Sequence, residues 1–159
     1  MSLLTFFQWC EASGIGETIR KSSWLFPVIE AIHLLGLGVI GGAVLVVDLR
    51  LLGLGLRRQS AAQLTRDAQP WLVWAFVGLV VTGIPQLMSN SIKEYYSIYF
   101  WVKMGILLPA FIFTFTIRRK VAMSAPSGPG SFQTKLVGLV SIVLWAGVAI
   151  TARLIGLLS

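Results

Sequence analysis

Residues 27–55 read PVIEAIHLLGLGVIGGAVLVVDLRLLGLG, the longest apolar run in the chain. Between Glu30 and Asp48 the run contains no ionisable residue other than His33, the only histidine of the sequence. About 20 apolar residues in helical form cross the hydrocarbon core of a bilayer. The run also lacks the polar–apolar alternation that the wall of a membrane β-barrel requires. It therefore predicts a transmembrane helix.

Three further segments have the same character, at about residues 70–88, 98–117 and 136–158. The chain of 159 residues is 56% hydrophobic and only 12% charged, whereas soluble domains carry about a quarter charged residues. We expect an all-α, polytopic membrane protein: a single domain over residues 1–159, folded as a four-transmembrane-helix bundle in the lipid bilayer. Before the first span, LLTFFQW at residues 3–9 predicts a short interfacial helix.

The distribution of basic residues predicts the orientation. Seven lie between spans one and two or between spans three and four, namely Arg57, Arg58, Arg66, Arg118, Arg119, Lys120 and Lys135. Three lie on the opposite side, namely Arg20, Lys21 and Lys93. Basic loops stay in the cytoplasm, so both termini are expected outside. The net charge of +7 is therefore explained by basic residues that flank membrane spans. The sequence lacks the interleaved aromatic and basic residues that would indicate binding of nucleic acid.

Polar and sulfur-containing residues collect at one depth in this topology. At 1.5 Å per residue, His33 lies about 9 Å and Lys103 about 8 Å inside the outer ends of their spans. Glu30, Met88 and Arg153 lie at similar levels. Buried charge is costly in a bilayer, so we expect these residues to face the bundle interior. Three interpretations are open: a structural clamp in which Glu30 pairs with Lys103 or Arg153, cations that only extend to the headgroups, or the lining of a ligand site.

Haem b is the ligand that this set fits best. One histidine does not make a zinc site, whereas haem needs only one or two axial ligands. His33 is the candidate ligand of the haem iron, with Met88 or an open position opposite. Lys103 and Arg153 would neutralise the propionates. The second ring nitrogen needs an acceptor, for which Glu30 or a backbone carbonyl is expected. A quinone or another redox partner is compatible with this interpretation.

Two further features of the first span have structural interpretations. Gly38 and Gly42 form a GxxxG motif, which is typical of close helix packing and is compatible with a homo-oligomer. Bare backbone at these glycines would equally admit a flat macrocycle. Asp48 and Arg50, at the inner end of the span, predict a structural charge clamp to neighbouring helices or to the basic loop.

Four stretches, SSWLFPVIEAIHLLGLG, DLRLLGLGL, TGIPQLMS and YFWVKMGILL, carry a resemblance over nearly the whole chain. They resemble a family of small, uncharacterised four-helix membrane proteins of bacteria, which implies the bacterial inner membrane. Together with the bias of the basic residues, this predicts periplasmic termini. More remotely, the histidine of helix one, the arginine near its inner end and WVK in helix three resemble two better-known groups. These are the HemJ-type protoporphyrinogen oxidase and the CopD-type copper-resistance domain.

The HemJ-type resemblance implies roles for two residues. In that group the histidine of helix one is associated with haem binding and the lysine of helix three is required for function, which would correspond to His33 and Lys103. Three functions stay open: a haem-binding redox protein, a non-enzymatic scaffold or transporter subunit, and a porphyrinogen oxidase. The sequence assigns no catalytic residue.

Overall fold

The computed structural model describes residues 2–56, 58–125 and 130–158, with only the backbone of residues 155–158. Within these residues the secondary structure is helical and contains no β-strand. Four helical stretches are long and apolar enough to cross a membrane. The predicted all-α, four-helix class is therefore confirmed, and the chain is a multi-pass membrane protein.

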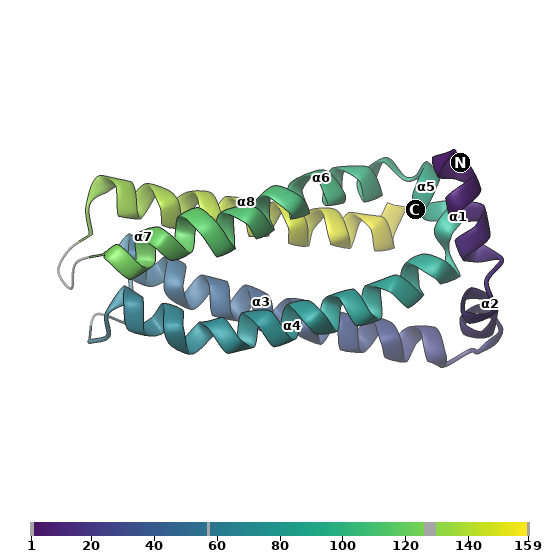
Figure 1. The fold of residues 1–159 in the computed structure, drawn as a ribbon, viewed down its shortest axis with the longest axis horizontal. Helices are drawn as coiled ribbons and strands as arrows, with labels where there is room; N and C mark the ends of the chain where they lie inside the picture. The colour runs from purple at the N-terminus through teal and green to yellow at the C-terminus, as the bar shows by residue number, and fades with distance from the viewer. Residues whose placement is uncertain (1, 57, 126–129, 159) are drawn as a thin grey trace.

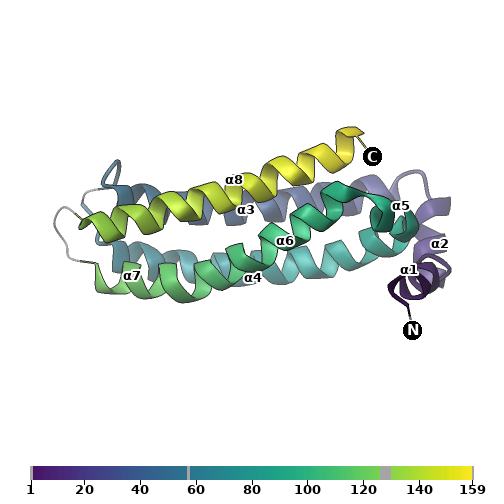
Figure 2. The same cartoon turned by 90° about the horizontal axis from the view of Figure 1, so that it is seen from above.

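The four spans run side by side along the length of the molecule (Figure 1). They are α3 (Leu25–Leu52), α4 (Ala61–Ser89), a continuous third helix over Ile98–Ser124, and α8 (Phe132–Leu158). The third helix consists of α6 (Ile98–Phe113), a π-helical turn η1 (Thr114–Arg118) and α7 (Arg119–Ser124). The first turn of α3 and the last turn of α8 lie at the same end of the bundle (Figures 1 and 2).

Several helix ends differ from the predicted spans because hydropathy marks only the part of a helix that suits lipid. The second span was expected to begin near Pro70, but α4 begins at Ala61, where the Ser60 hydroxyl accepts a bond from the Gln63 amide at 3.1 Å. In contrast, α3 ends at Leu52 because Gly53 adopts a left-handed conformation with φ of 77°. Its amide then bonds back to the carbonyl of Arg50, as in a common helix C-cap.

Three short helices cover the end of the bundle that holds the first turn of α3 (Figures 1 and 2). They are α1 (Leu3–Glu11), α2 (Gly14–Lys21) and α5 (Ser91–Tyr96). The sequence predicted a helix where α1 lies, but not α2, whose two glycines and three charged residues hide its apolar side. We call these three helices the cap. Phe6, Trp9 and Ile15 on the cap, and Trp24 at the start of α3, are exposed apolar side chains of the kind found in a membrane interface.

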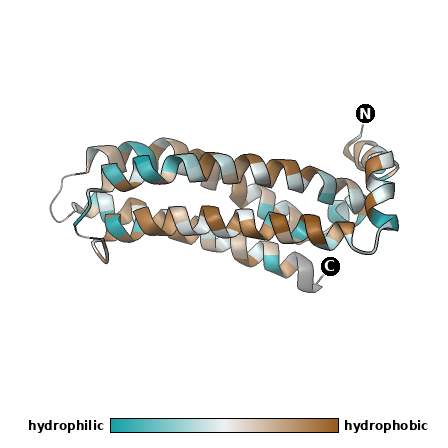
Figure 3. Ribbon diagram, turned by 90° about the horizontal axis from the view of Figure 1, so that it is seen from below, coloured by the Kyte–Doolittle hydropathy of each residue, from teal (hydrophilic) through white to brown (hydrophobic). Residues whose placement is uncertain are grey.

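The central helix of the packing is α3, which contacts both α4 and α8, while α6 packs on α8 and α4 packs on α7. The main core consists of Ile40, Val44, Leu72, Ala110, Trp145 and Val148. Large apolar side chains such as Leu35 and Trp74 point outward from the spans and are more than two-thirds exposed. Apolar residues follow the lengths of the long helices, and hydrophilic residues gather toward the helix ends (Figure 3). This surface is suited to lipid rather than water.

Gly16 fixes α2 against the end of α4. A Cβ atom at Gly16 would overlap the carbonyl oxygen of Met88, whereas one at Gly14 would meet nothing within 4 Å. Gly16→Ala should therefore lower the free energy of unfolding by about 1–3 kcal/mol, measured by denaturant titration in detergent micelles. Gly14→Ala is the matched control and should be neutral or slightly stabilising. Equal stability of the two variants would contradict the close packing at Gly16.

Candidate polar sites within the bundle

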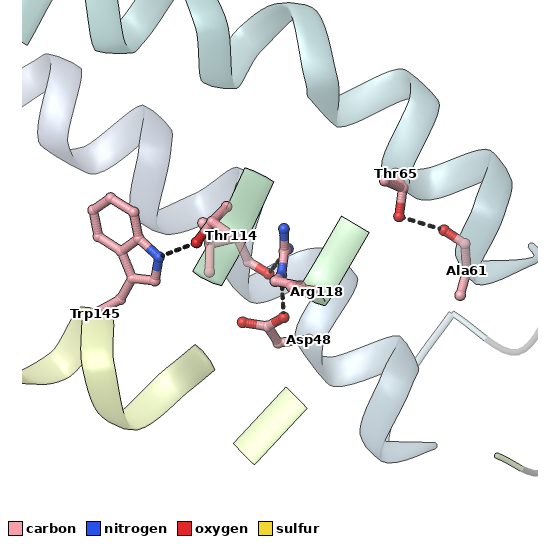
Figure 4. Close-up of polar contacts among 7 residues, drawn as sticks. Asp48, Ala61, Thr65, Thr114, Arg118 and Trp145 are labelled. Carbon is pink, nitrogen blue, oxygen red and sulfur yellow. Dashed lines mark hydrogen bonds and ion pairs between the residues drawn. The ribbon is translucent and has the colours of Figure 1, made fainter. Parts of the chain in front are cut away.

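A buried ion pair joins the end of α3 to the third helix (Figure 4). It lies toward the end of the bundle opposite α1 and α2, which we call the inner end after the predicted orientation. Arg118 Nε donates to Asp48 Oδ1 at 2.6 Å, and Arg118 Nη2 donates to the carbonyl oxygen of Val44 at 2.9 Å. Asp48 is 0% exposed and Arg118 is 1% exposed. The sequence analysis placed Arg118 in a cytoplasmic loop, which was wrong: the helix continues through it and turns it inward.

The π-helical turn explains why Arg118 faces the interior. Four residues of the third helix, Ala110, Thr114, Arg118 and Ala122, are buried at intervals of four. An α-helix of 3.6 residues per turn would rotate such a series off one face, while a wider π turn keeps it aligned. Thr114 then accepts a hydrogen bond from Trp145 Nε1 of α8 at 3.0 Å (Figure 4).

The surroundings of Asp48 are closely packed. A Cβ atom at Gly138 of α8 would lie 3.1 Å from the Asp48 carbonyl oxygen, so this glycine lets α8 approach α3. Ser141 of α8 lies beside the Asp48 carboxylate. The geometry nevertheless falls short of a hydrogen bond, so Asp48 Oδ2 and Ser141 Oγ have no partner among the described residues. The inner site therefore resembles a sealed structural cluster.

Arg50 forms a hydrogen bond with a different part of the fold from the one that Asp48 contacts. Its Nε donates to the carbonyl oxygen of Gln59 at 2.7 Å and ties the end of α3 to the connection that leads into α4. The two residues predicted to form one charge clamp thus hold separate parts of the fold: Asp48 binds the third helix, and Arg50 binds the connection.

A second polar layer lies in the half of the bundle nearer α1 and α2, which we call the outer half after the predicted orientation. Helices α3 and α6 run in the same direction, and His33 and Lys103 lie equally far before the paired residues Asp48 and Arg118 in the sequence. At 1.5 Å per residue this separation is about 22 Å. Lys103 lies within electrostatic range of the His33 imidazole. The predicted common depth of these two residues agrees with this arrangement.

The hydrogen bonds of His33 define its neutral tautomer. Its Nδ1 lies 2.8 Å from Thr82 Oγ1, and that hydroxyl donates its proton to the Gly78 carbonyl oxygen at 2.7 Å. We infer that the Thr82 hydroxyl accepts from Nδ1–H, an assignment that leaves the lone pair on Nε2 of the neutral ring. Opposite the ring, a Cβ atom at Gly83 would lie 3.3 Å from His33 Cε1. Thr82 and Gly83, which the sequence analysis did not single out, thus position the imidazole.

Glu94 of α5 is another residue that the sequence analysis missed. It is partly buried at the outer end and lies within electrostatic range of Lys103. Burial raises the pKa of Glu94 above its ordinary value, and the positive charges of Lys103 and Lys93 oppose this rise. The sequence feature that could have identified Glu94 is its position as an acidic residue in the short segment before span three. Glu94 extends the outer layer from His33 and Lys103 toward the membrane surface.

The raised pKa of Glu94 has a consequence for stability. A carboxyl group whose pKa is raised by folding adds stability below its unfolded pKa, and this stability is lost as the pH rises through the folded pKa. Relative to Glu94→Gln, the wild type should therefore lose melting temperature as the pH is raised from about 4 to about 8. Parallel profiles for the wild type and Glu94→Gln would contradict the burial of Glu94.

Three of the residues predicted to face the interior do not join this layer. Glu30 and Arg153 are exposed, so the prediction was wrong for both. The buried face of α3 passes through His33, while Glu30 lies beyond its edge. Met88 instead lines a groove under α2, together with Ile29 and Pro85.

The remaining sequence features also lie outside the two polar layers. Gly38 and Gly42 are exposed on α3, and a Cβ atom at either would meet nothing within 4 Å. Among the described residues, no group of three or more His, Cys, Asp or Glu side chains is arranged to hold a metal ion.

Comparison with known proteins gives a family but no activity. A model of a family of unknown function, DUF6644, matches residues 6–158. The chain belongs to this family. No curated protein and no solved structure matches the sequence significantly. The matched residues include both the inner ion pair and the outer layer around His33. Because the family has no known function, a function has to be argued from these two sites.

Proposed function

We propose that this chain is an integral membrane protein that binds a b-type haem through Nε2 of His33, in the outer half of the bundle, for redox chemistry or electron transfer. The observation that carries the proposal is the hydrogen bond of Nδ1–H to Thr82. Histidine ligands of metals commonly donate their second ring N–H to a fixed acceptor, which holds the tautomer and the ring orientation. His33 fits this arrangement, and no described residue forms a hydrogen bond with its Nε2.

The chemistry of the neighbouring residues supports the same ligand. A bound haem would supply one-electron redox chemistry, at a potential tuned by its axial ligand and surroundings. Lys103 supplies a positive charge near His33 that would balance a propionate. Gly83 lets the imidazole pack closely against α4, since a Cβ atom there would lie 3.3 Å from His33 Cε1. The remote resemblance to HemJ-type proteins involves the same histidine and lysine.

The proposed site is smaller than the sequence suggested. Glu30 and Arg153 are exposed, and Met88 lies in the groove under α2, so His33 is the one protein ligand that we assign. Porphyrinogen oxidation, a quinone as electron partner and self-association through Gly38 and Gly42 stay predictions.

A second candidate is a non-enzymatic scaffold or transporter subunit. The inner ion pair favours it, because Asp48 and Arg118 are fully buried and bonded to each other, as in a purely structural clamp. On this interpretation His33 and Thr82 would be a hydrogen-bonded contact between α3 and α4, with no ligand.

An absorption spectrum separates the two candidates. The full chain should be produced with ample haem precursor, extracted in mild detergent and purified. Haem binding predicts a Soret band that copurifies with the protein at about one haem per chain, with sharp bands on reduction. A colourless protein that also fails to take up added haemin would reject haem binding and favour the scaffold.

We also propose that the protein lies in the bacterial inner membrane with both termini in the periplasm. Arg118 is buried, but the other six basic residues at the inner end still outnumber the three at the outer end. Alkaline phosphatase fused after Ser159 should be active, and a fluorescent protein that folds only in the cytoplasm should be dark at the same position. The reverse pattern would overturn this orientation.

A further inference from the structure

An open apolar groove lies at the outer end of the bundle, between the cap helices α1 and α2 and the ends of α3 and α4. Its volume is about 810 Å³, within the range of small-molecule binding sites. Its apolar lining includes Trp9, Ile15, Ile19, Ile29, Pro85 and Met88. The groove is lined from four helices, so its shape depends on the cap being in place.

A second, smaller cavity of about 340 Å³ adjoins the groove. Ile19 of α2 lines both cavities and separates them. The second cavity is more polar, and Ser22, Ser23 and Asn90 contribute to its lining. Arg20 is its only charged residue among those described. An apolar groove thus lies directly beside a polar cavity that carries one positive charge.

Both cavities lie at the level where the chain meets the membrane surface. The cap helices expose the apolar side chains of Trp9 and Ile15, and the start of α3 exposes Trp24, as expected in the interface between headgroups and acyl chains. We propose that the groove binds an acyl chain of an anionic phospholipid of the outer leaflet, and that the lipid phosphate lies beside Arg20.

The charge and hydrogen bonding of Arg20 support an anionic headgroup. Its Nη1 donates to the Ser89 carbonyl oxygen at 2.9 Å, and its Nη2 donates to the Glu11 carbonyl oxygen at 2.7 Å. These bonds hold the guanidinium group in place while other N–H donors stay available for a phosphate. A neighbouring cation, Lys21, adds to the local positive charge, although it pairs with Glu17 at 2.6 Å. A fixed cation beside an apolar groove is complementary to an anionic phospholipid.

Native mass spectrometry of the full chain in mild detergent tests the acyl-chain site. With added phosphatidylglycerol, the wild type should retain one lipid per chain. Gly14 lines the groove, and its Cβ position is open, so Gly14→Phe should fill the groove without a backbone clash. We expect at least about tenfold weaker lipid retention in this variant. Gly38→Phe is the matched control, because Gly38 is equally open but lies outside the groove. Equal retention in all three proteins would overturn the proposal.

The headgroup is tested by a pair of adjacent substitutions with the same charge change. Arg20→Gln should weaken retention of phosphatidylglycerol about fivefold, and Lys21→Gln, outside the polar cavity, should weaken it less. The wild type should also prefer phosphatidylglycerol over phosphatidylcholine by about fivefold. Equal retention of the two lipids would overturn the proposal. If Arg20→Gln loses helical structure by circular dichroism, the lipid comparison in the wild type decides. Since neither readout involves His33, both are independent of haem binding.

Discussion

Asp48→Ala should lower the free energy of unfolding by about 3–5 kcal/mol, the largest effect on stability that we expect from a single substitution. The variant would leave the guanidinium group of Arg118 buried and without its carboxylate partner. The carbonyl oxygen of Val44 would still accept one of its hydrogen bonds but would not balance its charge. Reversible unfolding in mixed micelles with increasing detergent denaturant would measure the loss.

Two controls separate the unpaired charge from other effects of the substitution. Asp67→Ala removes a carboxylate from the exposed side of α4 and should change stability by less than about 0.5 kcal/mol. The double variant Asp48→Leu/Arg118→Met removes both charges and should recover most of the loss, since apolar replacements of a buried pair are commonly tolerated. If Asp48→Ala alone were as stable as the wild type, the ion pair would not hold the inner end together.

The fold class could be predicted because hydropathy and length report directly on a bilayer. Four apolar runs gave four helices, and the structure contains them. The ends of the helices were predicted less accurately, because capping residues, and not the lipid-facing part, determine where a helix begins and ends. Ser60 starts α4 well before Pro70, and Gly53 stops α3 before residue 55. These local signals were present in the sequence but were weaker than the apolar periodicity.

The sequence predicted the depth of the polar side chains in the membrane but not the direction in which they point. Counting residues from the ends of the spans placed His33 and Lys103 at one level, because both helices have the same rise per residue. The direction in which a side chain points depends on which helices pack around it. Glu30 therefore turned out exposed although it is only three residues from His33. The burial of Arg118 depends on a π-helical turn, which no pattern in the sequence predicted.

Our last prediction concerns how His33 is held. His33→Ala should remove the Soret absorption completely if Nε2 binds the haem iron, because the sequence contains no other histidine. Thr82→Val keeps the shape of the side chain but removes the acceptor for Nδ1–H. It should weaken haem retention about 10–100-fold, which is typical of losing the hydrogen-bond partner of a metal-ligating histidine. Thr82→Ser, which keeps the hydroxyl, should retain most of the affinity.

Thr151→Val on α8 is the matched control for Thr82→Val. Thr151 is also buried and also donates to a backbone carbonyl, that of Gly147 at 2.8 Å, but it has no hydrogen bond to His33. Because the chain has one histidine, the ¹⁵N resonances of its ring report the tautomer without interference, with or without haem. The wild type and Thr151→Val should show the Nδ1–H form, while Thr82→Val should show a mixture with the Nε2–H form. A wild-type ring already in the Nε2–H form would remove the free lone pair on which the proposed haem site depends.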